Sequence, residues 1–180
     1  MSINGLLALF DMAIADMASW SKHERHRFLL QTVKPIFRQA AVSPRLIANV
    51  IHDIIKESDE IDAHRQGLYC VGIDQEAVIV YADLIATGFE RCGQTDVKEV
   101  FRRAIRYGVN SIAVCHSIPQ GPVWVADEDE IFVMSLIDGG KLLGITSVDH
   151  LLVNAATGEF RSFRSAKRQW GWPLLSFRYR

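Results

Sequence analysis

The hydrophobic pattern of this chain changes period near Gly67, and this change constrains the fold more than any other feature. Between residues 46 and 55, apolar side chains recur three and four positions apart, as they do on one face of a helix. Residues 68–73 and 77–85 are instead two apolar runs separated by the polar turn 74–76, as in a β-hairpin. This change of pattern therefore predicts helices followed by a sheet.

Helical and strand patterns continue to alternate after the hairpin. Thr95 can cap a helix that ends at Gly108, and Asp127 can cap the next one, which Gly139-Gly140 should loosen in its later part. This order predicts an α/β fold with a mixed sheet flanked by helices. The remaining elements are expected as helices over 3–20, from Ser21 to Pro35 and from Ser43 to 55, and as strands over 111–115, 148–153 and 159–163.

Composition narrows the class of protein. The chain has 180 residues, which suits one domain or one domain with an appendage. Its net charge of −1 gives no general attraction to nucleic acid or to a membrane. No apolar run is long enough to span a bilayer, so we expect no membrane partner. The 3 cysteines are scattered without a CxxC pair, which favours a reducing, cytoplasmic location.

The densest group of potential metal ligands begins at Cys115. The apolar run 109–114 leads into Cys115-His116-Ser117-Ile118, and the acidic cluster 127–130 follows shortly after. Imidazole and carboxylate groups are common ligands of zinc. His116 and the acidic cluster are therefore candidate parts of a metal site at the end of a strand.

Several segments of the chain, from about Gly67 to Arg164, resemble the RadC family of JAB/MPN-fold proteins, which are related to the JAMM metallo-isopeptidases. The resemblance implies a JAB/MPN-like (cytidine-deaminase-like) fold, with a helical N-terminal segment over 1–64, a RadC-like domain over 65–164 and a C-terminal arm over 165–180. The segments that carry it are Arg102-Arg103-Ala104-Ile105, Gly108-Val109-Asn110-Ser111, Gly140-Lys141-Leu142-Leu143-Gly144-Ile145 and Asp149-His150-Leu151-Leu152-Val153.

The resemblance also implies roles for single residues. His116 falls on the first metal-binding His of the family, and Asp129 falls on its metal-binding Asp. Ile118 falls on the second metal-binding His, and its alkyl side chain has no lone pair to donate. Ala126 replaces the Ser that steadies an oxyanion, and Asp83 falls near the Glu that activates water.

The missing ligand separates two hypotheses. Catalytic zinc normally has three protein ligands and one open position. With only two, we expect no cofactor and a non-catalytic module that binds a protein partner or a second copy of itself, associated with DNA repair by resemblance alone. The alternative is a zinc-dependent peptidase or isopeptidase whose third ligand comes from elsewhere, with Cys115, Asp127, Glu128 and His150 as candidates.

The C-terminal arm supplies a third hypothesis. Its cations and aromatic rings can hold phosphates and stack on bases, so a nucleic-acid contact is a second alternative. The same residue types also pack on a domain or bind proteins. The residues concerned are Arg164, Lys167, Arg168, Trp170, Trp172 and Arg178.

Overall fold

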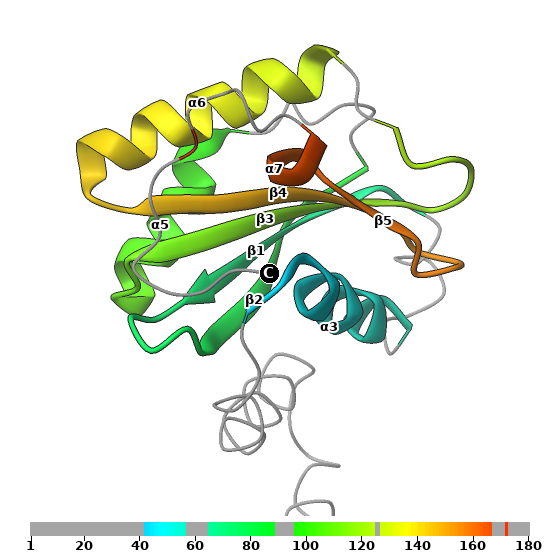
Figure 1. Ribbon diagram of the computed structural model, residues 1–180, viewed down its shortest axis with the longest axis horizontal. Helices are drawn as coiled ribbons and strands as arrows, with labels where there is room; N and C mark the ends of the chain where they lie inside the picture. Colours follow the sequence, from blue (N-terminus) through cyan, green and yellow to red (C-terminus); the bar gives the residue numbers. More distant parts are fainter. Residues whose placement is uncertain (1–41, 57–64, 89–95, 125–126, 167–171, 173–180) are drawn as a thin grey trace, which may run out of the picture.

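The computed structural model describes residues 42–56, 65–88, 96–124, 127–166 and 172. Its centre is a five-stranded mixed sheet in the order β2-β1-β3-β4-β5 (Figure 1). Strands β3 and β4 are parallel, whereas the other neighbours are antiparallel. This architecture confirms the predicted α/β fold. The strands are β1 (Gly67–Ile73), β2 (Ile79–Thr87), β3 (Ser111–Ile118), β4 (Thr146–Asn154) and β5 (Phe160–Ser162).

Helix α3 (Pro44–Lys56) covers one face of the sheet (Figure 1). As predicted, it begins after Ser43, whose Oγ accepts a hydrogen bond from the backbone N–H of Leu46 at 3.1 Å. Its apolar stripe, with Ile47 and Ile51 fully buried, packs into one core with the sheet. The predicted division of the chain at residue 64 stays a prediction, and the helices expected over 3–20 and 21–35 lie outside the described residues.

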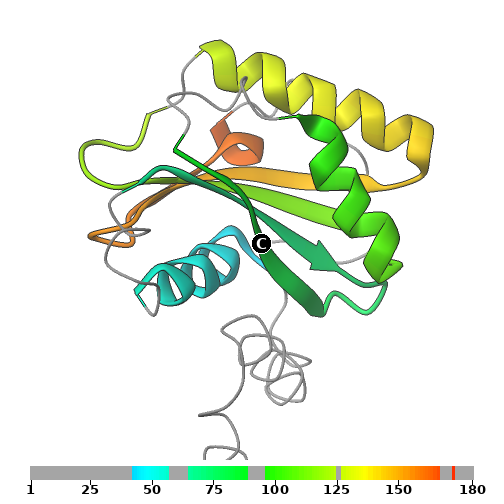
Figure 2. The same cartoon turned by 180° about the vertical axis from the view of Figure 1, so that it is seen from behind.

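Helices α5 (Val97–Tyr107) and α6 (Asp127–Leu143) lie on the opposite face of the sheet (Figure 2). Strand side chains alternate between faces, so β1 and β3 contribute residues to both cores. The cap of α5 is Asp96, whose carboxylate accepts from the N–H of Lys98 at 2.9 Å, so the prediction of Thr95 was wrong by one residue. Gly108 ends α5 with a φ of 65°, as predicted.

The expected loosening of α6 at its two glycines is wrong, because the helix runs on to Leu143. A side chain at Gly139 would meet the ring of Phe101, and one at Gly140 would meet the carbonyl oxygen of Ile145. The glycines therefore allow α6 to pack closely on its neighbours. Helix α7 (Phe163–Ala166), which the sequence pattern did not predict, follows β5 directly. Among the described residues, no helix is long and apolar enough to cross a membrane.

Candidate active site

His116 and Asp129 lie next to each other on the face of the sheet that α6 covers. His116 is near the end of β3, and Asp129 is in the first turn of α6. The imidazole Nδ1 and the carboxylate Oδ1 are 3.8 Å apart, and both side chains are buried. The structure thus brings together two residues that were singled out as candidate metal ligands.

Gln66, just before β1, is a third polar side chain at this position. Its Oε1 lies 3.0 Å from Nε2 of His116. The contact exists because β1 pairs with β3 in the register that places Leu68 opposite His116. Sequence reasoning missed Gln66, since one amide before an apolar strand carries no local signal. Both nitrogens of the imidazole therefore face a polar neighbour.

Ile118 occupies the position that the resemblance assigns to a second metal-binding His. It is half-buried and packs against an apolar cluster that joins β4, α6 and α7. The site is therefore apolar where an imidazole would be needed. The buried members of this cluster are Val123, Val133, Ile137, Leu152 and Phe163.

Asp83 lies away from His116 in the sheet. It pairs with Cys70 of β1, and its carboxylate is 3.3 Å from the guanidinium of Arg103 in α5. Leu68 of β1 pairs with His116 on one side and with Ala86 of β2 on the other, so Ala86, and not Asp83, is the β2 residue level with His116. Strand spacings place the Cα atoms of Asp83 and His116 about 12 Å apart. The structure therefore does not bring Asp83 to the two candidate ligands. Ala126, assigned to the oxyanion position, lies outside the described residues.

Two of the residues proposed as a third ligand, Cys115 and Asp127, do not complete the site. Cys115 points into the core under α3, on the face opposite to His116, as the strand pattern predicted. Burial raises the pKa of its thiol well above the ordinary value, so the thiolate that zinc needs is disfavoured. The side chain of Asp127 is exposed, and that of Glu128 is not among the described side chains.

His150 of β4 shares the face of His116. Its ring lies edge-on between Phe132 and Phe163, at centroid distances of 5.9 and 4.8 Å. Burial lowers its pKa to about 3, with Asp129 opposing and His116 reinforcing the shift. The imidazole is therefore neutral at physiological pH. Across the described parts of the chain, no three His, Cys, Asp or Glu side chains are grouped so that they could hold a metal ion.

Asp149, next to His150, is fully buried and anchors the end of the domain. Its carboxylate accepts hydrogen bonds from the N–H of His150 at 2.8 Å, the N–H of Arg164 at 2.9 Å and the hydroxyl of Ser162. One side chain thus ties β5 and α7 to β4.

Two residues of the predicted basic and aromatic group are described. The guanidinium of Arg164 donates to the carbonyl oxygen of Val148 at 3.0 Å and lies 5.6 Å from the ring centroid of Trp172. Trp172 in turn packs against the cluster that also contacts Ile118. Lys167, Arg168, Trp170 and Arg178 lie outside the described residues.

A family model described as the RadC-like JAB domain matches residues 41–169, which is most of the chain. The chain belongs to this family. The match begins before α3 and ends after α7, so the RadC-like JAB domain includes every element described above.

Curated relatives agree with this assignment. A UPF0758 protein of Cyanothece sp. (strain PCC 7425) is 36% identical over 73 residues, which cover 41% of this chain and 29% of the relative. A UPF0758 protein of Desulfitobacterium hafniense (strain DSM 10664 / DCB-2) is 27% identical over 119 residues, or 66% of this chain and 50% of the relative. The RadC-like JAB domain of this chain therefore spans half or less of the length of these relatives.

Proposed function

We propose that this RadC-like JAB domain does not work as a zinc hydrolase and acts instead as an interaction or assembly module. The observation that carries the proposal is the packing of Ile118 in an apolar cluster beside His116 and Asp129. A catalytic zinc site needs three protein ligands and a position for water. Among the described side chains, the candidate ligands do not fit such a site, because only His116 and Asp129 meet.

The side chains that could act as a general base also support a non-catalytic role. A hydrolase of this kind needs a base that removes a proton from water. The side chain that faces Nε2 of His116 is the amide of Gln66, which is not a base. The carboxylate of Asp83 is paired with Arg103 instead. We therefore derive no hydrolytic step from this site.

A retained fold with exposed apolar side chains fits a binding role. Apolar side chains that gather on the surface of a folded domain often mark a contact site for a partner. In the described residues, Ile105, Trp124, Ile131 and Leu142 are all more than half exposed. We expect a protein partner or a second copy of the chain. The association with DNA repair enters by family resemblance alone.

Metal content tests the proposal. We expect the protein, after dialysis in buffer without chelator, to contain well below one zinc per chain by elemental analysis. We also expect its thermal unfolding to stay cooperative and unchanged by added zinc or EDTA. His116→Ala should change neither metal content nor the response to zinc. Stoichiometric zinc that is lost in His116→Ala would overturn the proposal.

The hydrolase alternative needs a third ligand, and among the described candidates His150 lies on the same face of the sheet as His116. It predicts bound zinc that is lost in His150→Ala as well as in His116→Ala. The nucleic-acid alternative depends on the arm, and it predicts affinity that falls steeply with salt and disappears when residues 165–180 are removed. The contacts of Arg164 and Trp172 with the domain favour packing of the arm instead.

A further inference from the structure

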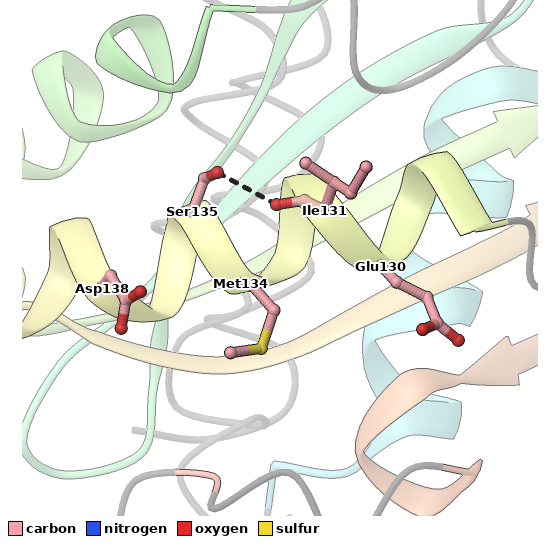
Figure 3. Close-up of a pocket in the computed structure, with 5 residues that line it drawn as sticks. All are labelled: Glu130, Ile131, Met134, Ser135 and Asp138. Atoms are coloured by element: carbon pink, nitrogen blue, oxygen red, sulfur yellow. Dashed lines mark hydrogen bonds between the residues drawn. The ribbon is translucent and has the colours of Figure 1, made fainter.

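The outer side of α6 carries a shallow groove that neither the sheet nor the candidate site uses. It has a volume of about 540 Å³ and is lined, within the described residues, by Glu130, Ile131, Met134, Ser135 and Asp138 (Figure 3). Ile131 is 69% exposed and Met134 is 40% exposed. Exposed apolar side chains in a polar rim are typical of a docking surface.

One described residue of the C-terminal arm, Trp172, lies close to the inner face of α6. Trp172 packs against the cluster that contains Val133 and Ile137, which are inner-face residues of α6. On a helix with about 100° between residues, Met134 lies about 60° round from Ile137. The eight residues after Trp172 therefore follow a residue that packs against the same cluster as the inner face of α6. The stacking of Arg164 on Trp172 adds a second contact that holds the arm there.

The eight residues after Trp172 match the groove in chemistry. Their sequence is Pro-Leu-Leu-Ser-Phe-Arg-Tyr-Arg, with apolar and cationic side chains and no acid. The groove presents the apolar Ile131 and Met134 between two carboxylates, Glu130 and Asp138. Asp138 also pairs with Lys141 at 2.9 Å, but both side chains are more than 60% exposed, so this pair can exchange readily.

The length of residues 173–180 is also sufficient to cover the groove. Glu130 and Asp138 are eight positions apart on α6, which corresponds to about 12 Å along the helix axis. Eight extended residues span up to about 26 Å, which is more than twice this distance. A tethered segment also acts at an effective concentration in the millimolar range, so weak contacts are enough for docking within one molecule.

We propose that residues 173–180 dock within the same chain along the outer groove of α6, with Trp172 as the anchor. The groove is then an internal binding site, and a partner that uses this face must displace the arm. This inference does not depend on whether zinc binds at His116, because the groove lies on the other side of α6 from Asp129.

A peptide titration tests the proposal. A fluorescent peptide with the sequence of residues 173–180 is added to the full chain and to a chain that ends at Trp172, and binding is followed by fluorescence anisotropy at low salt. We expect the shortened chain to bind the peptide at least 10-fold more tightly than the full chain, whose groove is occupied. Binding should weaken with added salt, because part of the attraction is between charges.

Two surface variants provide the control. Ile131→Lys in the shortened chain should weaken peptide binding about 10-fold or more, since it places a cation in the groove. Ile105→Lys, at a residue of α5 that is 62% exposed, should leave binding unchanged. Cooperative thermal unfolding of all three proteins checks that they are folded.

Three results would overturn the proposal. One is binding of a scrambled peptide as tight as that of the true sequence. Another is equal binding of the true peptide by the full and shortened chains. The third concerns a second copy as the occupant: a full chain that is dimeric by light scattering, and monomeric when it ends at Trp172, would show that the arm docks between chains.

Discussion

The amide oxygen Oε1 of Gln66 lies 3.0 Å from Nε2 of His116, although 50 positions separate the two residues. On the other side of the ring, Nδ1 faces the carboxylate of Asp129 at 3.8 Å. The imidazole that would be the first ligand of a metal is thus held between two polar side chains. Any ion that used Nε2 would have to displace the amide.

Restoring the missing ligand should create a metal site. Ile118→His places an imidazole two positions after His116, on the same face of β3. With Asp129 this completes three ligands of types that zinc prefers. We expect zinc affinity to rise at least 10-fold over that of the unaltered protein, measured by competition with a zinc-binding dye.

Ile118→Leu is the matched control, because it keeps the apolar packing and adds no ligand. It should leave zinc affinity unchanged. Ile118→His should also lower the free energy of unfolding in the absence of metal, by about 2 kcal/mol, because it removes an aliphatic side chain from a packed cluster. Equal zinc affinity in all three proteins would contradict this account of the site.

His150 should make the protein sensitive to acid. Its pKa is about 3 in the folded state and about 6.5 when exposed. The unfolded chain therefore binds more protons between these two values, so stability is full above about pH 6.5 and is lost as the pH falls toward 3. The loss should be roughly 1 kcal/mol for each pH unit in this window.

The variant His150→Phe tests this origin, since a phenyl ring keeps the aromatic contacts with Phe132 and Phe163 and does not titrate. Unfolding by urea at several pH values from 7 to 4 gives the comparison. We expect the free energy of unfolding of the variant to fall less steeply with acid. Parallel curves for the two proteins would assign the acid sensitivity to other groups.

Asp149 should contribute strongly to the free energy of unfolding. Its buried carboxylate accepts hydrogen bonds from two backbone N–H groups and the hydroxyl of Ser162. Asp149→Ala leaves these donors buried without an acceptor, and we expect a loss of about 3 kcal/mol in urea unfolding. Amide exchange should accelerate most in 160–166, which the carboxylate ties to β4.

Ser162→Ala removes only one of these donors, so its cost should be about 1 kcal/mol. A loss in Asp149→Ala no larger than that in Ser162→Ala would mean that the backbone contacts contribute little.

The two glycines of α6 should respond differently to alanine. A methyl group at Gly140 would meet the carbonyl oxygen of Ile145, a backbone atom that cannot move alone. At Gly139 it would meet only the ring of Phe101, which can shift. We expect Gly140→Ala to lower the free energy of unfolding by about 2 kcal/mol despite the better helix propensity of alanine. Gly139→Ala should cost clearly less, and the reverse order in thermal unfolding would contradict the packing described here.

The elements that could be predicted from the sequence are those fixed by local chemistry. Ser43 and Pro44 start α3 because a cap and a fixed φ act within a few residues. The hairpin β1–β2 follows from two apolar runs around Asp74, whose carboxylate accepts from the N–H of Glu76 and of Val78. These signals do not depend on the rest of the fold.

The parts that escaped prediction depend on contacts between distant segments. Gln66 meets His116 only through the register of β1 on β3. The exposure of Ile131 could not be predicted, because α6 carries apolar residues on more than one side. The periodicity of the sequence therefore does not identify the outer face of this helix. Asp83 matched a family position in the sequence, but the pairing of the strands separates it from His116, and the packing of α5 places Arg103 beside it.

The single parallel pair in the sheet has a further consequence. Because β3 and β4 run in the same direction, the chain must return from the end of β3 to the other edge of the sheet before β4 begins. Helix α6 makes this return. Its starting point is therefore set by topology, so the meeting of Asp129 with His116 survives whatever stands at position 118. A third ligand can therefore be added or removed at position 118 alone while the path of the chain stays the same.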